Sequence, residues 1–190
     1  MAKNSTDDSA ISHPLERLAR LMRAGEHDGG LNPAQWEALR FLSRANRFSN
    51  SPIGLTRFLG STKGTISQTI KALERKGHLA KLPRAGEKRS ISLMLTDKGR
   101  QTLRDDPLTA LSASLEELGN KTRRRLARGL QELLSLELVR REQKSFGTCN
   151  TCRYFREDGS GNEVNGPHSC MLFKEVLSDA EVQLICVEHS

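Results

Sequence analysis

The stretch between residues 52 and 95 constrains the fold more than any other part of the chain. Apolar residues at helical spacing predict a short helix over 52–59 and a longer one over 62–76, with a glycine turn between them. The residues that follow alternate in hydrophobicity over 78–83 and 90–95, which predicts two strands around a polar tip. Helix, turn, helix and hairpin in this order predict a winged helix-turn-helix.

The longer helix carries signals for its start, its end and its buried side. Thr62 or Ser61 can cap the N-terminus, and Gly77 stands just beyond the last turn, where a left-handed residue commonly ends a helix. The inward stripe consists of Ile66, Ile70 and Leu73. Gly64 costs the helix about 1 kcal/mol relative to alanine. It indicates close approach of the backbone to DNA, and the alternatives are packing against a neighbour or simple tolerance of the glycine.

The outward face of this helix and the tip of the hairpin are polar and basic, which suits duplex DNA. Residues 61–89 include eight Lys/Arg against two Asp/Glu. Glutamine can read adenine in the major groove, hydroxyl groups contact base edges or phosphates, and basic side chains neutralise phosphates. The candidate DNA contacts are Ser61, Thr62, Lys63, Thr65, Ser67, Gln68 and Lys71 on the helix, and Arg84, Lys88 and Arg89 on the wing.

Further helices are expected on both sides of this unit. Residues 1–12 are polar and expected to be disordered, and a helix then follows with Pro14 in its first turn. Asn32 can cap the next helix. Residues 97–145 are expected to form two long helices, interrupted at LGNKT, whose leucine stripes are long for a monomer of this size. These stripes predict a homodimer interface, and a large monomer core is the alternative.

The charge of the chain is unevenly distributed. The net charge is +7, but residues 149–190 contain three Lys/Arg and seven Asp/Glu, a net of −4, so the first 148 residues carry +11. A basic body favours a polyanionic partner. No segment approaches the roughly 20 apolar residues of a membrane span, and the N-terminus lacks the apolar core of a signal peptide. We therefore expect a cytoplasmic protein without membrane contact.

Residues 31–140 resemble the MarR family of dimeric winged-helix regulators. The similar stretches are LGSTKGTISQTIKALERKGHLAKLP, GEKRS and LMLTDKGR. The resemblance implies that the first stretch contains the recognition helix and that Arg89 reaches the minor groove from the wing. It places Glu87 where the family has an aspartate that orients this arginine. It also implies a triangular homodimer, a pseudo-palindromic site in double-stranded DNA, and repression as the default mode.

All four cysteines lie in residues 149–190, a tail that the MarR resemblance leaves unexplained. Cys149 and Cys152 form a C-x2-C pair, and Cys170 and Cys186 follow singly at similar intervals. This spacing resembles that of high-potential iron–sulfur proteins and favours a 4Fe-4S cluster with the four cysteines as ligands. Zinc is the alternative metal, and in that case His168 or His189 could replace a cysteine. Four free thiols and a disulfide switch are further alternatives.

The chain is therefore expected to be mainly α with a small β-wing. Residues 1–12 form a disordered N-terminus, and residues 13–148 form a winged-helix and dimerisation domain with a DNA-binding core at 50–96. Residues 149–190 form a module whose thin apolar core needs a metal staple.

The favoured function is a transcription regulator whose operator binding depends on the metal centre of the tail. The centre would act on the spacing between the two recognition helices, because the dimerisation helix ends next to it, near Ser145. The alternative is a regulator that responds to a small organic ligand and uses the tail as a structural zinc module. An enzyme is not expected, because the sequence shows no Ser-His-Asp order, no phosphate-binding glycine loop and no paired carboxylates.

Overall fold

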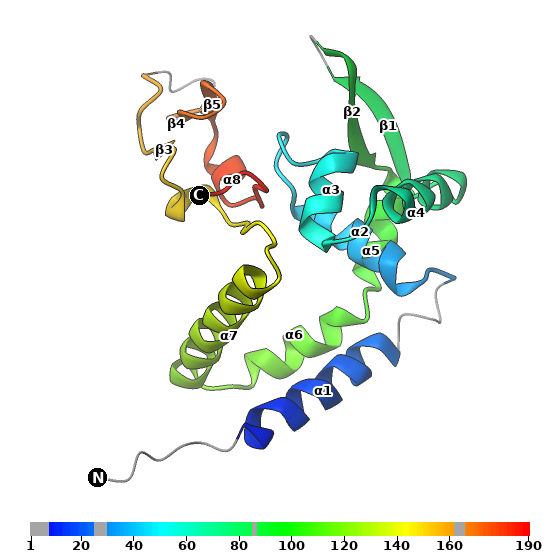
Figure 1. The fold of residues 1–190 in the computed structure, drawn as a ribbon, viewed down its shortest axis with the longest axis vertical. Coiled ribbons are helices and arrows are strands. Elements are labelled where there is room, and N and C mark those ends of the chain that lie inside the picture. Colours follow the sequence, from blue (N-terminus) through cyan, green and yellow to red (C-terminus); the bar gives the residue numbers. More distant parts are fainter. Residues whose placement is uncertain (1–7, 25–29, 85–86, 162–165) are drawn as a thin grey trace.

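A winged-helix body forms the centre of the computed structural model, which describes residues 8–24, 30–84, 87–161 and 166–190 (Figure 1). The body consists of α2 (Pro33–Arg44), α3 (Pro52–Leu59), α4 (Lys63–Arg75), β1 (Leu79–Arg84), β2 (Glu87–Leu95) and α5 (Asp97–Arg104). The strands β1 and β2 pair antiparallel, from Leu79 opposite Leu95 to Arg84 opposite Glu87. The winged helix-turn-helix that the pattern over 52–95 predicts is confirmed.

Local side-chain signals explain the ends of these helices. Asn32 caps α2 and forms a reciprocal pair of hydrogen bonds with Gln35. The Thr62 hydroxyl accepts a hydrogen bond from the Thr65 N–H at the start of α4. Gly60 ends α3 at φ 58°, a left-handed conformation that favours glycine.

The core of the body lies between α2, α3, α4 and the two strands. Ile66, Ile70 and Leu73 are all buried, which confirms the predicted inward stripe of α4. They pack in one cluster with residues from the other elements, namely Leu31, Trp36, Ala38, Leu39, Phe41, Leu42, Leu55, Leu79 and Leu93. Val187, from the far C-terminal end of the chain, belongs to the same cluster. The tail therefore completes the core of the body.

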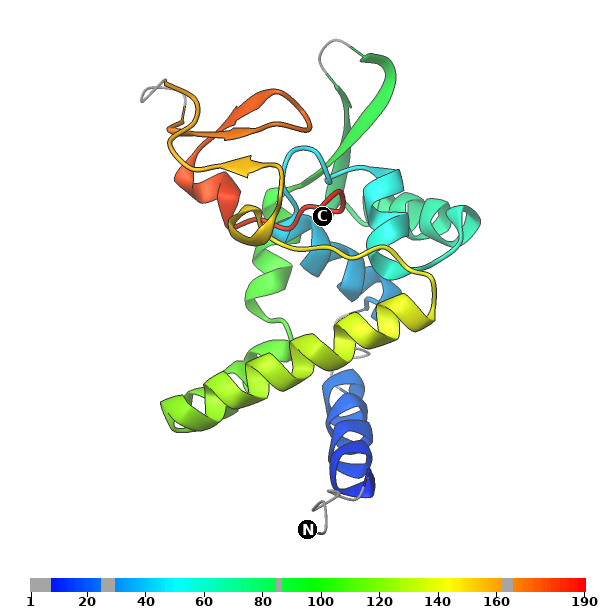
Figure 2. The same cartoon turned by 60° about the vertical axis from the view of Figure 1, so that its left-hand side comes forward.

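Three helices extend away from the body and form an arm: α1 (Ser9–Ala24), α6 (Leu108–Glu116) and α7 (Asn120–Arg140). In Figures 1 and 2 the arm lies toward one end of the molecule, and the wing and the tail lie toward the other. Neither α1 nor α7 contains a buried residue. Among the described residues, no helix is both long enough and apolar enough to cross a membrane.

The arm differs from the sequence expectation in two places. The first helix begins at Ser9, so Pro14 lies inside it, and four residues expected to be disordered are helical. The region from 97 onward divides into α5 and α6, because the chain turns at 105–107. The Asp106 carboxylate holds this turn by accepting hydrogen bonds from the Leu108 N–H, at 2.9 Å, and from the Arg40 guanidinium, at 2.6 and 2.8 Å. The break at LGNKT is confirmed between α6 and α7.

The Arg40–Asp106 ion pair connects the arm to α2. Both side chains are buried. Burial alone would raise the pKa of the Asp106 carboxyl, but the hydrogen bonds from Arg40 and Leu108 outweigh it and hold that pKa below its usual range. Asp106 is therefore a buried carboxylate that stays ionised because its partners are already in place.

The tail is a small three-stranded sheet with short helical turns. A 3-10 turn, Cys149–Thr151, leads to β3 (Phe155–Arg156), β4 (His168–Cys170), β5 (Glu175–Leu177) and α8 (Asp179–Val182). The sheet order is β3-β4-β5, and both pairs are antiparallel. The tail's own core consists of Cys149, Leu177 and Val182, packed against Phe48, Phe155 and Cys170. So few buried side chains cannot stabilise an independent domain of this size.

The last residues of the tail pair with the loop that joins α2 to α3, residues 45–51, which we call the α2–α3 loop. The Ile185 N–H donates to the Arg44 carbonyl at 2.7 Å, and the Asn46 N–H donates to the Ile185 carbonyl at 2.9 Å. The Val187 N–H donates to the Ser49 hydroxyl at 3.0 Å. The tail is thus attached to the body by backbone pairing and by burial of Val187.

We predict that Val187→Ala destabilises the body although the residue belongs to the tail. Loss of the two methyl groups from the core should lower the free energy of unfolding by about 2 kcal/mol. The measurement is urea unfolding at fixed protein concentration, followed by the fluorescence of Trp36, the single tryptophan, which is buried in the body core.

Val182→Ala is the matched control, because it makes the same change in the tail's own core. It should move the Trp36 transition by much less than Val187→Ala does. An unchanged transition in Val187→Ala would contradict the assignment of this residue to the core of the body.

Candidate nucleic-acid interface and four-cysteine cavity

The side of α4 opposite its buried stripe is exposed and polar. The exposed residues include most of the predicted contacts, namely Thr62, Lys63, Thr65, Ser67, Gln68 and Lys71, while Ser61 is half-buried. The hydroxyl oxygens of Thr62 and Thr65 lie 2.9 Å apart. Most of the predicted helix contacts thus share one surface along α4.

Gly64 lies in open space at the start of this surface. A methyl group at its Cα would meet only the Thr62 hydroxyl, at 3.8 Å. Packing within the chain therefore does not require a glycine here. The open space fits both close approach of an external group and simple tolerance of a glycine at this position.

The wing contributes one described basic side chain near its tip, Arg84. Its guanidinium donates to the Arg47 carbonyl at 2.9 Å and to the Asn50 side chain at 3.3 Å, so Arg84 is held against the α2–α3 loop. The side chains of Lys88 and Arg89, and that of Glu87, lie outside the described residues. Their predicted roles in DNA contact and arginine orientation stay predictions.

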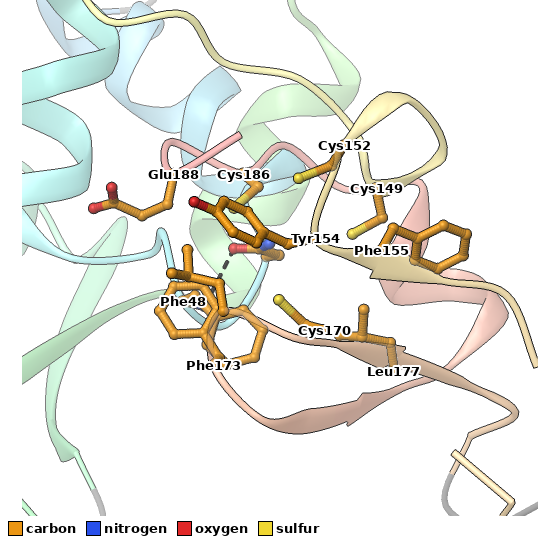
Figure 3. Close-up of a pocket in the computed structure, with 12 residues that line it drawn as sticks. Phe48, Cys149, Cys152, Tyr154, Phe155, Cys170, Phe173, Leu177, Cys186 and Glu188 are labelled. Atoms are coloured by element: carbon orange, nitrogen blue, oxygen red, sulfur yellow. Dashed lines mark hydrogen bonds between the residues drawn. The ribbon is translucent and has the colours of Figure 1, made fainter. Parts of the chain in front are cut away.

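The four cysteines come together around one cavity (Figure 3). Cys149 lies in the 3-10 turn, and Cys152 follows it, with its N–H donating to the Cys149 carbonyl at 2.8 Å. Cys170 is the last residue of β4. Cys186 pairs with Gly147 through two backbone hydrogen bonds. All four are free thiols.

The rest of the cavity wall is largely aromatic and aliphatic. The lining residues besides the cysteines are Tyr154, Phe155, Leu172, Phe173, Leu177, Glu188, Asn46 and Phe48. Asn46 and Phe48 belong to the α2–α3 loop, and Phe48 stacks on Phe173 at 4.1 Å between ring centroids. The sequence analysis missed these two residues, because they stand in a polar loop about 100 positions before the first cysteine and carry no local signal of this contact.

Burial governs the chemistry of two of the thiols. It raises the pKa of the Cys149 thiol to about 11, and the neighbouring cysteines contribute to this rise. Burial also raises the pKa of Cys186, and hydrogen bonds with the side chains of Asn46 and Ser49 counteract part of this rise. Any metal that binds here must therefore displace protons from the thiols.

Neither of the two candidate histidines lines the cavity. His168 is buried in the tail, where its Nδ1 accepts from the Asp158 N–H at 3.2 Å and its Nε2 lies 3.0 Å from Asp179. The Nε2 of His189 lies 2.9 Å from the Thr151 hydroxyl. These positions favour the four cysteines over either histidine as ligands.

The metal site itself is not confirmed. Among the described residues, no three His, Cys, Asp or Glu side chains are grouped closely enough to hold a metal ion as they stand. The structure thus brings the four predicted ligands to one cavity, and the identity of what they bind stays a prediction.

The sequence profile of the MarR family matches residues 29–90, which span α2, α3, α4, β1 and the start of β2. Among curated protein sequences, none matches the chain at a significant level.

Solved structures of similar fold include proteins described as MarR and MarR/EmrR regulators. A MarR transcriptional regulator from Methanosarcina mazei Go1 is 22% identical with a TM-score of 0.55, covering 70% of this chain and 96% of its own. A MarR/EmrR family regulator from Acinetobacter sp. ADP1 is 23% identical with a TM-score of 0.52, covering 67% and 94%. A MepR mutant from a multidrug-resistant clinical isolate of S. aureus is 16% identical with a TM-score of 0.56, covering 69% and 97%. The chain therefore has the MarR-type winged-helix fold.

Proposed function

We propose that this protein is a homodimeric transcription regulator that binds double-stranded DNA through α4 and the wing. The observation that carries the proposal is the exposed face of α4, where Ser67, Gln68 and Lys71 project from a helix fixed by buried side chains on its other side. A polar and basic face on a rigid helix suits insertion into the major groove. The regulators of similar fold support this reading.

The exposed leucines of the arm support the homodimer. Leu126, Leu130, Leu133 and Leu134 are each at least 40% exposed, and their spacing places them on one side of α7. Leu15, Leu18 and Leu21 of α1 are also exposed by more than 40%. Apolar faces of this length on two elements of the arm are typical of an interface. A second copy that covers them would set the distance between two recognition helices, as a pseudo-palindromic site requires.

We further propose that DNA binding depends on a thiolate-bound metal centre in the four-cysteine cavity, with an iron–sulfur cluster favoured and zinc as the alternative. The convergence of four free thiols from separate segments on one cavity supports this. The thin core of the tail also needs an additional source of stability, which a bound metal can supply. A small organic effector remains the alternative signal.

We predict that Gln68→Ala and Lys71→Ala weaken DNA binding in different ways. The probe is a duplex selected for binding from a random-sequence pool. Gln68→Ala should reduce discrimination between base pairs at one position by about 10- to 100-fold, because a bidentate contact is lost. Lys71→Ala should weaken binding to all sequences. It should also reduce, by about one, the magnitude of the slope of the logarithm of the binding constant against the logarithm of the salt concentration.

Lys121→Ala, at the start of α7 in the arm, is the matched lysine control and should leave both quantities unchanged. If Gln68→Ala and Lys71→Ala behaved like this control, α4 would not be the DNA-reading helix.

We predict that the double substitution Leu130→Glu and Leu134→Glu converts the dimer to a monomer. Two carboxylates in an apolar interface would each be desolvated without a partner. The mass in solution should fall from that of two chains to one, as measured by light scattering. Val139→Glu is the control, because Val139 is 77% exposed and its spacing places it on the opposite side of α7. A dimeric double variant would refute this interface.

We predict that metal-loaded and metal-stripped dimers differ at least about tenfold in affinity for the selected duplex, within the usual range for coupling between two sites. A variant with all four cysteines changed to alanine should bind like the stripped protein whether or not metal is supplied. Equal affinities of the loaded and stripped dimers would leave the DNA-binding proposal intact and eliminate metal sensing.

A further inference from the structure

We infer that the four-cysteine cavity takes a polynuclear iron–sulfur cluster shared between the tail and the winged-helix body, and that the α2–α3 loop transmits its presence to the wing. Both halves of this inference rest on the proposed function: the first takes up its metal centre, and the second adds the path from that centre to the wing. The test of the cofactor is independent of DNA binding.

The spacing of the thiols and the lining of the cavity favour a cluster over a single ion. Tetrahedral zinc draws four sulfurs to within about 3.8 Å of one another, since each Zn–S bond is about 2.3 Å. The four thiols instead stand apart around one cavity, and no three His, Cys, Asp or Glu side chains in the described ranges are grouped closely enough to hold a single ion. A cluster that takes one thiolate on each iron can connect thiols that stand apart in this way. The aromatic rings in the wall would keep water from its sulfides.

Part of the site belongs to the body. Asn46 is 2% exposed and lines the cavity together with Cys186. Ser49 is fully buried, and its hydroxyl accepts a hydrogen bond from the N–H of Val187, the residue after Cys186. Groups that surround a ligand in this way orient it and tune the metal centre. Phe48 closes the same wall and stacks on Phe173 of the tail. A cluster in this cavity would therefore contact the α2–α3 loop as well as the tail.

Cys186 connects the cavity to the loop through its two neighbours. Ile185 and Val187 hydrogen-bond the loop and the end of α2 on either side of Cys186, and Val187 is buried in the body core. The loop itself is shaped by the Asn46 side chain, whose oxygen accepts from the N–H groups of Phe48 at 3.2 Å and Ser49 at 3.0 Å. A ligand that fixes Cys186 would thereby also fix the conformation of the α2–α3 loop.

The same loop contacts the wing and forms the start of α3. The Leu93 N–H donates to the Asn50 carbonyl at 2.7 Å, and Arg84 donates to Arg47 and Asn50. Ser51, the last residue of the loop, caps α3. The path from cluster to wing thus lies within one protomer. It differs from the route through the dimerisation helix and recognition-helix spacing that the sequence suggested.

The cofactor is tested by anaerobic preparation of the full chain, supplied with ferrous iron and sulfide, and by analysis of metal and acid-labile sulfide. We expect about four iron and four sulfide per chain and a broad visible absorption, both reduced in each single Cys→Ala variant. Protein that instead takes one zinc per chain, colourless and without labile sulfide, would overturn the cluster.

The transmission is tested by backbone amide hydrogen exchange of the cluster-loaded and cluster-free dimer, without DNA. We expect slower exchange in the loaded protein at residues 45–51 and 90–95, and equal exchange in α7. Protection confined to residues 149–184, or a change confined to α6 and α7, would overturn the proposed path. Failure of DNA binding would affect neither measurement.

Ser49→Ala separates ligation from transmission, because it leaves all four cysteines in place and removes the hydroxyl that contacts Cys186 and Val187. It should retain the iron content but reduce the effect of the cluster on loop exchange by about fivefold, the worth of one hydrogen bond. Ser43→Ala, an exposed serine at the end of α2, should match the unsubstituted protein. An unchanged cluster effect on exchange in Ser49→Ala would show that the path does not pass through this loop.

Discussion

The pairing of residues 185–187 with the α2–α3 loop is the interaction on which the arrangement of the other parts depends. Without it, the tail would be attached only through the chain that follows α7, and the body would lose Val187 from its core. With it, the tail, the helix-turn-helix and the wing share one short loop. The cavity exists because this pairing carries Cys186 to the thiols of the other segments.

Much of the body could be predicted from the sequence because its signals are local. The cap at Thr62, the turn at Gly60 and the buried stripe that begins at Ile66 each depend on residues only a few positions apart. Spacing in the sequence is therefore enough to place α3 and α4. The sequence pattern misplaces the start of α1 and gives no sign of the break before α6, for the converse reason. Pro14 is tolerated inside a helix that begins earlier, and the turn near Asp106 is held by Arg40, far away in the sequence.

The cysteine site also shows that contacts between distant segments cannot be predicted from local sequence signals. The residue types and their spacing were enough to single out four candidate ligands, because thiols in one short segment have few other uses. The wall formed by Asn46 and Phe48 could not be found this way, because it depends on a contact between segments separated by most of the chain. What the sequence presented as a separate module is therefore a lobe that shares its cavity with the body.

The tail is acidic and the body is basic, and ion pairs join the two parts. Glu175 and Glu181 pair with Arg47, and Glu188 pairs with Arg57 and Lys144. Each of these exposed or half-exposed pairs contributes little to stability, but together they remove basic groups from the surface that attracts phosphates without regard to sequence. Lys63 and Lys71 of α4 have no part in them and stay exposed. In the proposed complex with DNA, the tail would therefore reduce unspecific attraction while its hydrogen bonds hold the loop and the wing in place, and both effects would favour discrimination between DNA sequences over affinity alone.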